Sequence, residues 1–399
     1  MIQKTRIQRN IPLDYAHTFV RNLNVTHGIW VMYLLSLKYT LFDIGVFESV
    51  FHLSSMAFEV PTGMVADLFG RKLSRILGIV VAMGYIAIML WFDSYPMMIL
   101  AFTLLGLSYT FESGSGEALV YDSLKRLGKE ETFIRFNGRK EAFYQLGTTI
   151  SLFGGGYIAM ISFDLNFQLM FGIYLLAIIL ITLMTDIPVN HQHTTGVTQR
   201  FKHHFIDSIK TVLSNKRLCL LIVMSALIAA PVTTIFFFAQ DYLIQLAFTR
   251  GEVGLFLAGH SLFAALGGIF AHKIERKWKE KKILRYVPLF SLVMFWLMVI
   301  EPIYVIPFMV IGFFDSIFYV VMADYVNKLT PSNKRATVLS FGALTFSIIM
   351  IILFPSVGFF AERVGYQSTT YLLAGITTVV YLLLLWILST EHFKIHGSK

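Results

Sequence analysis

Long apolar runs separated by short polar stretches fill most of the chain, and they set the first expectation. Clear runs cover residues 42–68, 73–92, 96–124, 336–360 and 370–388. Crossing a bilayer takes about 20 apolar residues as a helix, so each span with its connection uses roughly 30 residues. A chain of 399 residues therefore predicts an all-α membrane protein of about twelve spans.

Composition supports this interpretation. Hydrophobic residues make up 56% of the chain and charged residues 14%, whereas a soluble protein has about 25% charged residues. The net charge of +9 does not indicate nucleic acid, because nearly all Lys and Arg fall in alternate loops. The other loops carry Lys38, Arg250 and Arg363. By the positive-inside rule, we expect both termini in the cytoplasm, a lipid bilayer as partner and no nucleic acid.

Several chemistries have little support. The single cysteine, Cys219, allows no disulfide within the chain and no zinc cluster. No cleavable signal peptide is evident, because a polar tail precedes the first run. The polar stretch with His191, His193, His203 and His204 resembles a solvated linker more than a metal site. We expect no cofactor and no metal.

One stretch, Glu59 to Arg75, ends an apolar run and turns sharply into the next. Gly63 lets a neighbouring helix approach closely, and Gly70 permits the tight turn. Asp67 stands where it can meet a helix dipole or an arginine. A positive cluster of Arg71, Lys72 and Arg75 marks the cytoplasmic side.

Gly63, Asp67, Gly70, Arg71 and Lys72 resemble the signature loop between helices two and three of the major facilitator superfamily. With Glu59 and Pro61 included, the spacing resembles the variant of clostridial-type tetracycline efflux proteins. The resemblance implies a monomer in the cell membrane with two pseudo-symmetric six-helix halves. We place these halves at residues 1–188 and 216–399, with a cytoplasmic linker at 189–215.

The second half contains a degenerate copy of the loop. Ala271 to Lys277 aligns with Ala66 to Lys72, and Asp324 corresponds to Asp122. Parallel repeats of this kind relate the two halves of such transporters. We expect Arg71 to pair with Asp122, Asp67 to cap a helix of the other half, and Arg276 to pair with Asp324.

Ionisable residues within spans are functional candidates by default. Arg21 lies in the first span, predicted at residues 13–37, and points inward or else snorkels to the headgroups. Glu48, His52 and Glu59 share one face of the second span, with Glu48 near enough to the surface to be solvated. The third span is nearly featureless and should face lipid. Three acids, Glu112, Glu117 and Asp122, descend the fourth span.

The resemblance implies that helices one, four, seven and ten line a central cavity, and the candidate residues fall into three groups. The candidates for proton coupling are Glu59, Glu117, Glu112 and Arg21. Those for the substrate cavity are Glu112, Asp315, Asp241, Tyr109, Phe111 and Phe314. Those for a conformational latch are Gly63, Asp67, Gly70, Arg71, Lys72, Asp122, Arg276 and Asp324.

These residues predict a proton-coupled secondary transporter that works by alternating access. The acidic excess favours a cationic or zwitterionic amphiphile, such as a tetracycline, as the substrate. The resemblance to efflux proteins implies export against protons. A proton-coupled importer of a small solute and a receptor that does not transport are the alternatives.

The chain has neither a phosphate-binding loop nor a His-Glu-x-x-His motif, and Ser115 has no histidine placed to activate it. We therefore expect neither an ATP-driven pump nor an enzyme. The helix-four arginine motif and the helix-five Gly-Pro pair of drug antiporters are absent.

Overall fold

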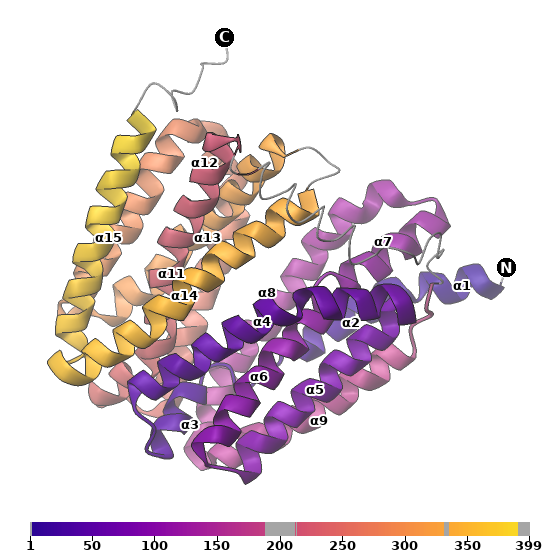
Figure 1. The fold of residues 1–399 in the computed structure, drawn as a ribbon, viewed down its shortest axis with the longest axis horizontal. Helices are drawn as coiled ribbons and strands as arrows, with labels where there is room; N and C mark the ends of the chain where they lie inside the picture. The colour runs from indigo at the N-terminus through magenta and orange to yellow at the C-terminus, as the bar shows by residue number, and fades with distance from the viewer. Residues whose placement is uncertain (1, 188–211, 213, 331–334, 390–399) are drawn as a thin grey trace. The chain divides into compact units, whose positions relative to one another are not determined.

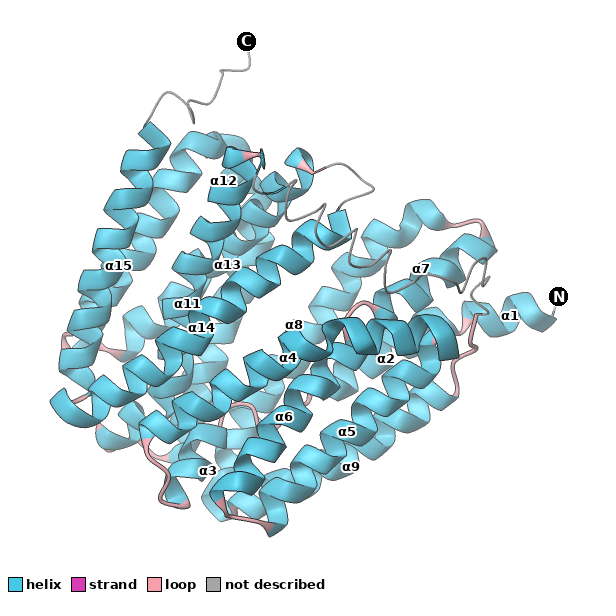
Figure 2. Cartoon of the chain, viewed as in Figure 1, coloured by secondary structure: helices cyan, strands magenta, loops and turns pink. Residues whose placement is uncertain are grey.

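The computed structural model describes residues 2–187, 212, 214–330 and 335–389. These residues form helices joined by short loops, with no strand among them (Figure 2). Two compact units divide the chain. Unit 1 comprises Met1–Tyr39, Val46–Gln192 and Leu243–Ala258; unit 2 comprises Thr40–Gly45, His193–Tyr242 and Gly259–Lys399. The predicted linker, with its four histidines, lies almost wholly outside the described residues.

Most helices of the first half of the chain belong to unit 1 (Figure 1). They are α1 (Ile2–Gln8), α2 (Asn10–Asn22), α3 (Trp30–Ser36), α4 (Leu41–Phe69), α5 (Arg71–Trp91), α6 (Tyr95–Glu112), α7 (Ser115–Leu127), η1 (Glu130–Thr132), α8 (Phe133–Ile161) and α9 (Phe163–Thr182). Here α5 packs between α6 and α9, and α2 packs on α8 and α9. This arrangement brings polar residues of α2, α5 and α6 together.

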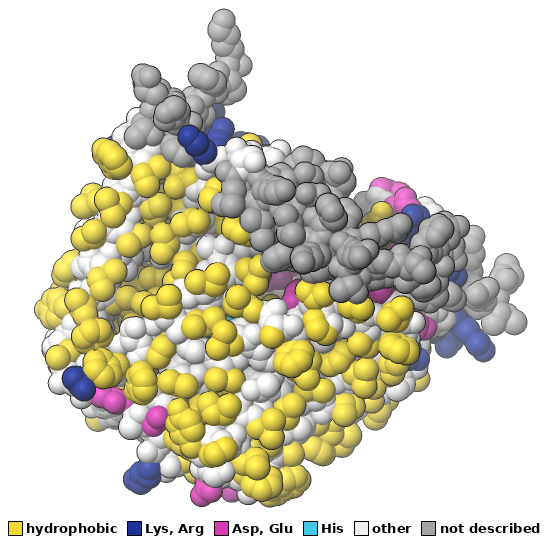
Figure 3. Space-filling view, viewed as in Figure 1, with side chains coloured by type: hydrophobic (Ala, Val, Ile, Leu, Met, Phe, Trp, Pro, Cys, Tyr) yellow, Lys and Arg dark blue, Asp and Glu magenta, His cyan; other side chains and the backbone are white. Residues whose placement is uncertain are grey.

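Unit 2 is built from the later helices. They are α11 (Lys216–Gln245), α12 (Arg250–Met298), η2 (Glu301–Ile303), α13 (Val305–Leu329), α14 (Arg335–Val364) and α15 (Tyr366–Ser389). The backbone at Lys279 leaves the helical region, with φ 56° and ψ 169°, so α12 is two helices joined at a kink. One face of α15 exposes a row of large apolar side chains, Tyr371, Leu372, Ile376, Val379, Leu383 and Trp386. Apolar side chains cover much of the visible surface (Figure 3), as expected for a protein in contact with lipid.

The number of spans agrees with the prediction. Nine of the described helices are long and apolar enough to cross a membrane. Counting α12 as two spans, and adding α8 and the α2–α3 pair, gives twelve. The predicted all-α membrane fold is confirmed, and the chain crosses the membrane many times.

Two predicted spans are interrupted. The first was expected to be one helix over residues 13–37, but α2 ends at Asn22 and α3 begins at Trp30. The fourth was expected to run unbroken over residues 96–124, but Gly114 adopts a left-handed conformation with φ 71° and separates α6 from α7. Both predictions were wrong because apolar periodicity does not reveal where tertiary hydrogen bonds can replace those of a helix.

Asn166 on α9 supplies such hydrogen bonds to the first break. Its side chain is fully buried, and its Nδ2 donates to the carbonyl oxygens of Val25 at 2.8 Å and Gly155 at 2.9 Å. Gly155 itself allows the approach, because a Cβ there would lie 2.5 Å from the Val25 oxygen. Gly155 of α8 therefore has a packing role at this point.

We predict that Asn166→Ala lowers the free energy of unfolding by about 1–3 kcal/mol, because it removes both donors from a buried site. The measurement is reversible unfolding in denaturant, with the protein in lipid nanodiscs. Gln168→Ala, an exposed position on the same helix, is the control and should change little. Equal losses in the two variants would contradict this account of the break.

Candidate functional site

The turn between α4 and α5 is anchored on the end of α9. Gly70 has φ 97°, and a Cβ there would lie 2.5 Å from Asp186 Oδ2, so glycine is needed for both conformation and space. Lys72 Nζ donates to the carbonyl oxygens of Thr182 at 2.6 Å and Met184 at 2.8 Å. Lys72 thus supplies donors to carbonyls at a helix C-terminus, where a cation is favourable.

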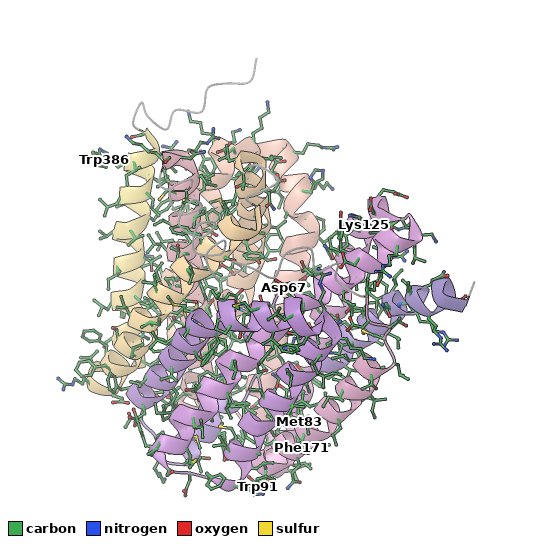
Figure 4. All side chains as sticks on the ribbon, turned by 45° about the vertical axis from the view of Figure 1, so that its right-hand side comes forward. Asp67, Met83, Trp91, Lys125, Phe171 and Trp386 are labelled. Atoms are coloured by element: carbon green, nitrogen blue, oxygen red, sulfur yellow. The ribbon has the colours of Figure 1, made fainter. Side chains whose placement is uncertain are left out.

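Arg71 Nη1 donates to Asp122 Oδ2 on α7, so these two residues form an ion pair within unit 1. Asp67 is exposed and lies, with Lys125, toward the end of unit 1 opposite Trp91 (Figure 4). The expected close approach of a neighbouring helix at Gly63 is wrong for the described residues, because none of their atoms lies within 4 Å of a Cβ built there. The role of Asp67 at the other half of the chain stays a prediction.

The second-half copy is arranged differently. Asp324 pairs with Lys328, one turn later on α13, at 2.5 Å, and Arg276 is exposed. Glu275 Oε1 instead accepts from the Tyr325 hydroxyl at 3.4 Å. The expected Arg276–Asp324 pair is wrong for the described structure, because a partner four residues away on the same helix is nearer to Asp324.

Arg75 is the centre of a buried charged cluster that joins three helices. Its side chain has no exposed surface. Its Nη1 donates to Asp14 Oδ1 on α2 at 2.7 Å, and its Nε lies 3.1 Å from Glu112 Oε1 on α6, with Nη2 3.0 Å from the same oxygen. Lys140 Nζ on α8 lies 4.0 Å from Asp14 Oδ2. A buried guanidinium is tolerated because it is paired and hydrogen-bonded on both sides.

His17 completes the cluster, and its contact with Arg75 determines its tautomer. His17 Nδ1 lies 2.7 Å from Arg75 Nη2. Arginine can only donate hydrogen bonds, so Nδ1 accepts and the neutral ring carries its proton on Nε2. The unpaired polar atoms among the described residues include His17 Nε2, Asp14 Oδ2 and Glu112 Oε2. Each partner of Arg75 thus keeps one buried polar atom that makes no hydrogen bond to a described residue, and for Asp14 this atom is the oxygen that faces Lys140.

The break between α6 and α7 is held against α5 beside this cluster. Ser74 Oγ donates to the Phe111 carbonyl oxygen at 2.8 Å, and Ser115 Oγ donates to Ser74 Oγ at 3.3 Å. Gly116 lies against Arg75, since a Cβ there would be 3.3 Å from Arg75 Cζ. The interruption of the helix therefore places the backbone of the fourth span next to buried charge.

Two interpretations of the sequence are corrected here. The third span is not featureless and does not simply face lipid, because Arg75 and Ser74 on α5 are fully buried. Glu48 is not solvated: it is 8% exposed and lies 3.6 Å from His52 Nε2. In both cases the neighbouring helices cover a residue that its position in the sequence had suggested was at the surface.

Three predicted residues of unit 1 remain accessible near the helix break. Glu59 and Glu117 are exposed, and Tyr109 is 57% exposed. Glu59 Oε1 accepts a long hydrogen bond of 3.5 Å from Ser113 Oγ. Among the described residues, neither Glu59 nor Glu117 forms an ion pair. Arg21 Nη1 lies 3.6 Å from Glu112 Oε1, so Arg21 points inward.

The predicted cavity residues of unit 2 are separate from these. Asp315 on α13 and Asp241 on α11 are partly buried, and Phe314 stacks on Phe290 with ring centroids 5.2 Å apart. His260 Nδ1 donates to the Phe308 carbonyl oxygen at 2.8 Å. That Asp315, Asp241 and Phe314 line one cavity with Glu112 stays a prediction. Among the described residues, no group of three or more His, Cys, Asp or Glu side chains is arranged to hold a metal ion.

Sequence reasoning missed Asp14, His17 and Arg75 as members of the cluster. Asp14, His17 and Arg21 are spaced by three and four residues, which places them on one helix face. That spacing was a usable signal. Arg75 carried no comparable signal, because a basic residue just after a cytoplasmic turn is ordinary.

The profile of the Major Facilitator Superfamily matches residues 22–308 and 245–399 of the chain. An uncharacterized MFS-type transporter, YxaM of Bacillus subtilis (strain 168), is 25% identical over 82% of this chain and 83% of its own length. A probable sugar efflux transporter of Helicobacter pylori (strain P12) is 27% identical over 34% of this chain and 35% of its own length.

Solved structures with the same fold include a nucleoside transporter and a POT family transporter. A D323A mutant of the nucleoside transporter NupG gives a TM-score of 0.80 at 14% identity, covering 96% of this chain and 99% of that one. The POT family transporter PepTSo gives 0.73 at 12% identity, covering 96% and 99%. At these identities the likeness shows the fold alone.

We predict that Arg75→Leu destabilises the protein by about 3–5 kcal/mol, because it leaves Asp14 and Glu112 buried without their shared cation. The double variant Arg75→Leu with Asp14→Leu should recover part of this loss, since it removes one of the stranded charges. Thermal unfolding in nanodiscs measures both. Lys125→Leu at an exposed position on α7 is the control. A double variant less stable than the single one would contradict the cluster as described.

Proposed function

The chain belongs to the Major Facilitator Superfamily, and on that premise we propose that it is a proton-coupled exporter of a cationic or zwitterionic amphiphile, such as a tetracycline. The family and the relatives make it a membrane transporter and not an enzyme. We place it in the cell membrane with both termini in the cytoplasm, because its basic residues fall in alternate loops. It works by alternating access.

The observation that carries the proposal is the contrast between balanced and unbalanced carboxylates in unit 1. Glu112 faces Arg75 and Arg21, so its charge is balanced. Glu59 lies within the span α4 and is exposed in unit 1. Among the described residues, its side chain accepts only the long hydrogen bond from the Ser113 hydroxyl and forms no ion pair. A carboxylate within a span costs free energy unless it faces a partner or a water-filled cavity, and for this reason it marks a candidate functional site. Glu59 is therefore the leading proton carrier, with Glu117 next.

Export is supported by the relatives that are described as probable sugar efflux transporters, although they match only about a third of the chain. What those proteins move is not carried over, because fold and partial similarity do not fix the substrate. The acidic side chains Glu59 and Glu117 favour a substrate that carries a positive charge.

The Arg71–Asp122 ion pair is the proposed conformational latch. It ties the start of α5 to α7 at the end of unit 1 that we assign to the cytoplasm. Breaking such a contact shifts the equilibrium between the states that face the two sides of the membrane. The latch acts on the rate of the transport cycle and leaves the substrate site unchanged.

For proton coupling, we predict that Glu59→Gln abolishes substrate-induced proton release from inverted membrane vesicles with an acidic interior. The vesicles are tested with a panel of tetracyclines, cationic dyes and other antibiotics. Loss of the titratable group removes the coupling while leaving the shape of the site. Glu130→Gln in η1, exposed and outside the spans, is the matched control and should behave as wild type.

If no compound of the panel causes proton release from vesicles that contain folded wild-type protein, multidrug export is rejected and an importer or a receptor is favoured. Proton release that survives in Glu59→Gln would reject Glu59 as the carrier.

For the latch, we predict that Arg71→Gln and Asp122→Asn each lower the maximal transport rate by about tenfold, which corresponds to about 1.4 kcal/mol. The apparent KM should stay near the wild-type value. The exchange Arg71→Asp with Asp122→Arg should restore part of the rate, and Lys125→Gln should have little effect. An unchanged rate in both single variants would exclude the latch.

A further inference from the structure

Arg21 has more hydrogen-bonding capacity than the described residues use. Its side chain is 26% exposed, and its Nη1 lies 3.6 Å from Glu112 Oε1, which is an ion pair without a hydrogen bond. No described residue accepts a hydrogen bond from its guanidinium group. A guanidinium group has five N–H donors in a fixed plane and cannot lose its proton in a protein. An arginine inside a span with unused donors must face water or a ligand.

The charges around Arg21 are balanced without it. Asp14 and Glu112 are the two carboxylates of the cluster, and Arg75 contacts both. Lys140 Nζ, 4.0 Å from Asp14 Oδ2, supplies a second positive charge. Arg75 Nη2 lies 3.0 Å from Glu112 Oε1, whereas Arg21 Nη1 lies farther from the same oxygen, at 3.6 Å. Arg21 is therefore a surplus cation.

Glu59 is a surplus anion in the same unit. It is exposed on α4, and its only hydrogen bond among the described residues is the long one from Ser113 Oγ. The Tyr109 side chain is 57% exposed. Tyr109 lies one helical turn before Ser113, whose hydroxyl contacts Glu59, and three residues before Glu112, which pairs with Arg21. Its ring meets Phe51 edge to face with centroids 6.0 Å apart. One accessible region of unit 1 thus presents a carboxylate, an aromatic surface and a guanidinium group.

We propose that the substrate is a zwitterion, whose anionic group binds Arg21, whose cationic group binds Glu59 and whose apolar body lies on Tyr109. The inference rests on the proposed transport function and narrows its substrate class. A monocation would pair with Glu59, but Arg21 would repel it and keep its hydrogen-bond donors unused. A monoanion would pair with Arg21, but Glu59 would repel it. A zwitterion pairs both charges, and guanidinium recognition of a carboxylate is bidentate and strong.

The test compares ligands that differ only in the anionic group. Purified full-length protein in nanodiscs is titrated with ciprofloxacin, ampicillin and phenylalanine, each beside its methyl ester, and binding is measured calorimetrically. For wild-type protein we expect at least one zwitterion to bind about tenfold more tightly than its ester, equivalent to about 1.4 kcal/mol. Arg21→Gln should remove this preference while leaving ester binding within about twofold.

Two variants separate this role from a structural one. Arg21→Lys keeps the positive charge and should retain part of the preference, although it loses the planar fork. Arg126→Gln, at an exposed position on α7, is the matched control and should retain all of it. Thermal unfolding of each variant checks that the fold is intact.

The zwitterion is rejected if no zwitterion binds more tightly than its ester, or if Arg21→Gln keeps the preference. Binding that follows the expected pattern, without proton release in vesicles, would reject proton antiport and leave the zwitterion site standing. The two proposals can therefore fail separately.

Discussion

A guanidinium group removed entirely from solvent is the constraint on which unit 1 depends. Arg75 enters the interior five residues after Gly70. Its burial requires carboxylates from α2 and α6 and a neutral His17 at its remaining edge. Taking a charge out of water is tolerated only when geometry and hydrogen bonds are both favourable. The positions of α2, α5 and α6 relative to one another are therefore determined by polar contacts as well as by apolar packing.

The interruptions of two spans follow the same principle. A break in a membrane helix exposes backbone groups that lipid cannot satisfy. At residues 23–29 the buried Asn166 side chain donates to the Val25 carbonyl oxygen. Near Gly114 the Ser74 hydroxyl donates to the Phe111 carbonyl oxygen and accepts from the Ser115 hydroxyl. Non-helical backbone in transporters of this kind lines polar cavities. Here the breaks bring Glu112 and Ser113 toward a region where Glu59 and Tyr109 are accessible.

The ionisable residues thus separate into two classes by their contacts. Asp14, Glu112, Arg75 and Lys140 balance one another in charge and are suited to holding the fold. Glu59, Glu117 and Arg21 are not fully paired in unit 1 and are suited to groups that arrive and leave. A transport site needs incompletely paired residues that can bind a substrate or a proton. It also needs charge-balanced residues around them, because a binding group must be held in place.

The sequence alone determined the class of the protein. Apolar runs of span length, the low charge content and the Gly63 to Lys72 pattern suffice for an all-α transporter fold, because the bilayer imposes a length and a polarity on every span. The pairing of Arg71 with Asp122 was also anticipated, from the resemblance of the loop.

Only the tertiary structure decided which charges are buried together. Which helices are neighbours decides where the spans break, after Asn22 and at Gly114. It also decides that Arg75 and Glu48 are buried, and that Asp324 pairs with Lys328 and not with Arg276. One-dimensional periodicity identifies a helix and its apolar face, but a buried charge is stabilised by residues far away in the sequence, and the sequence pattern does not record them.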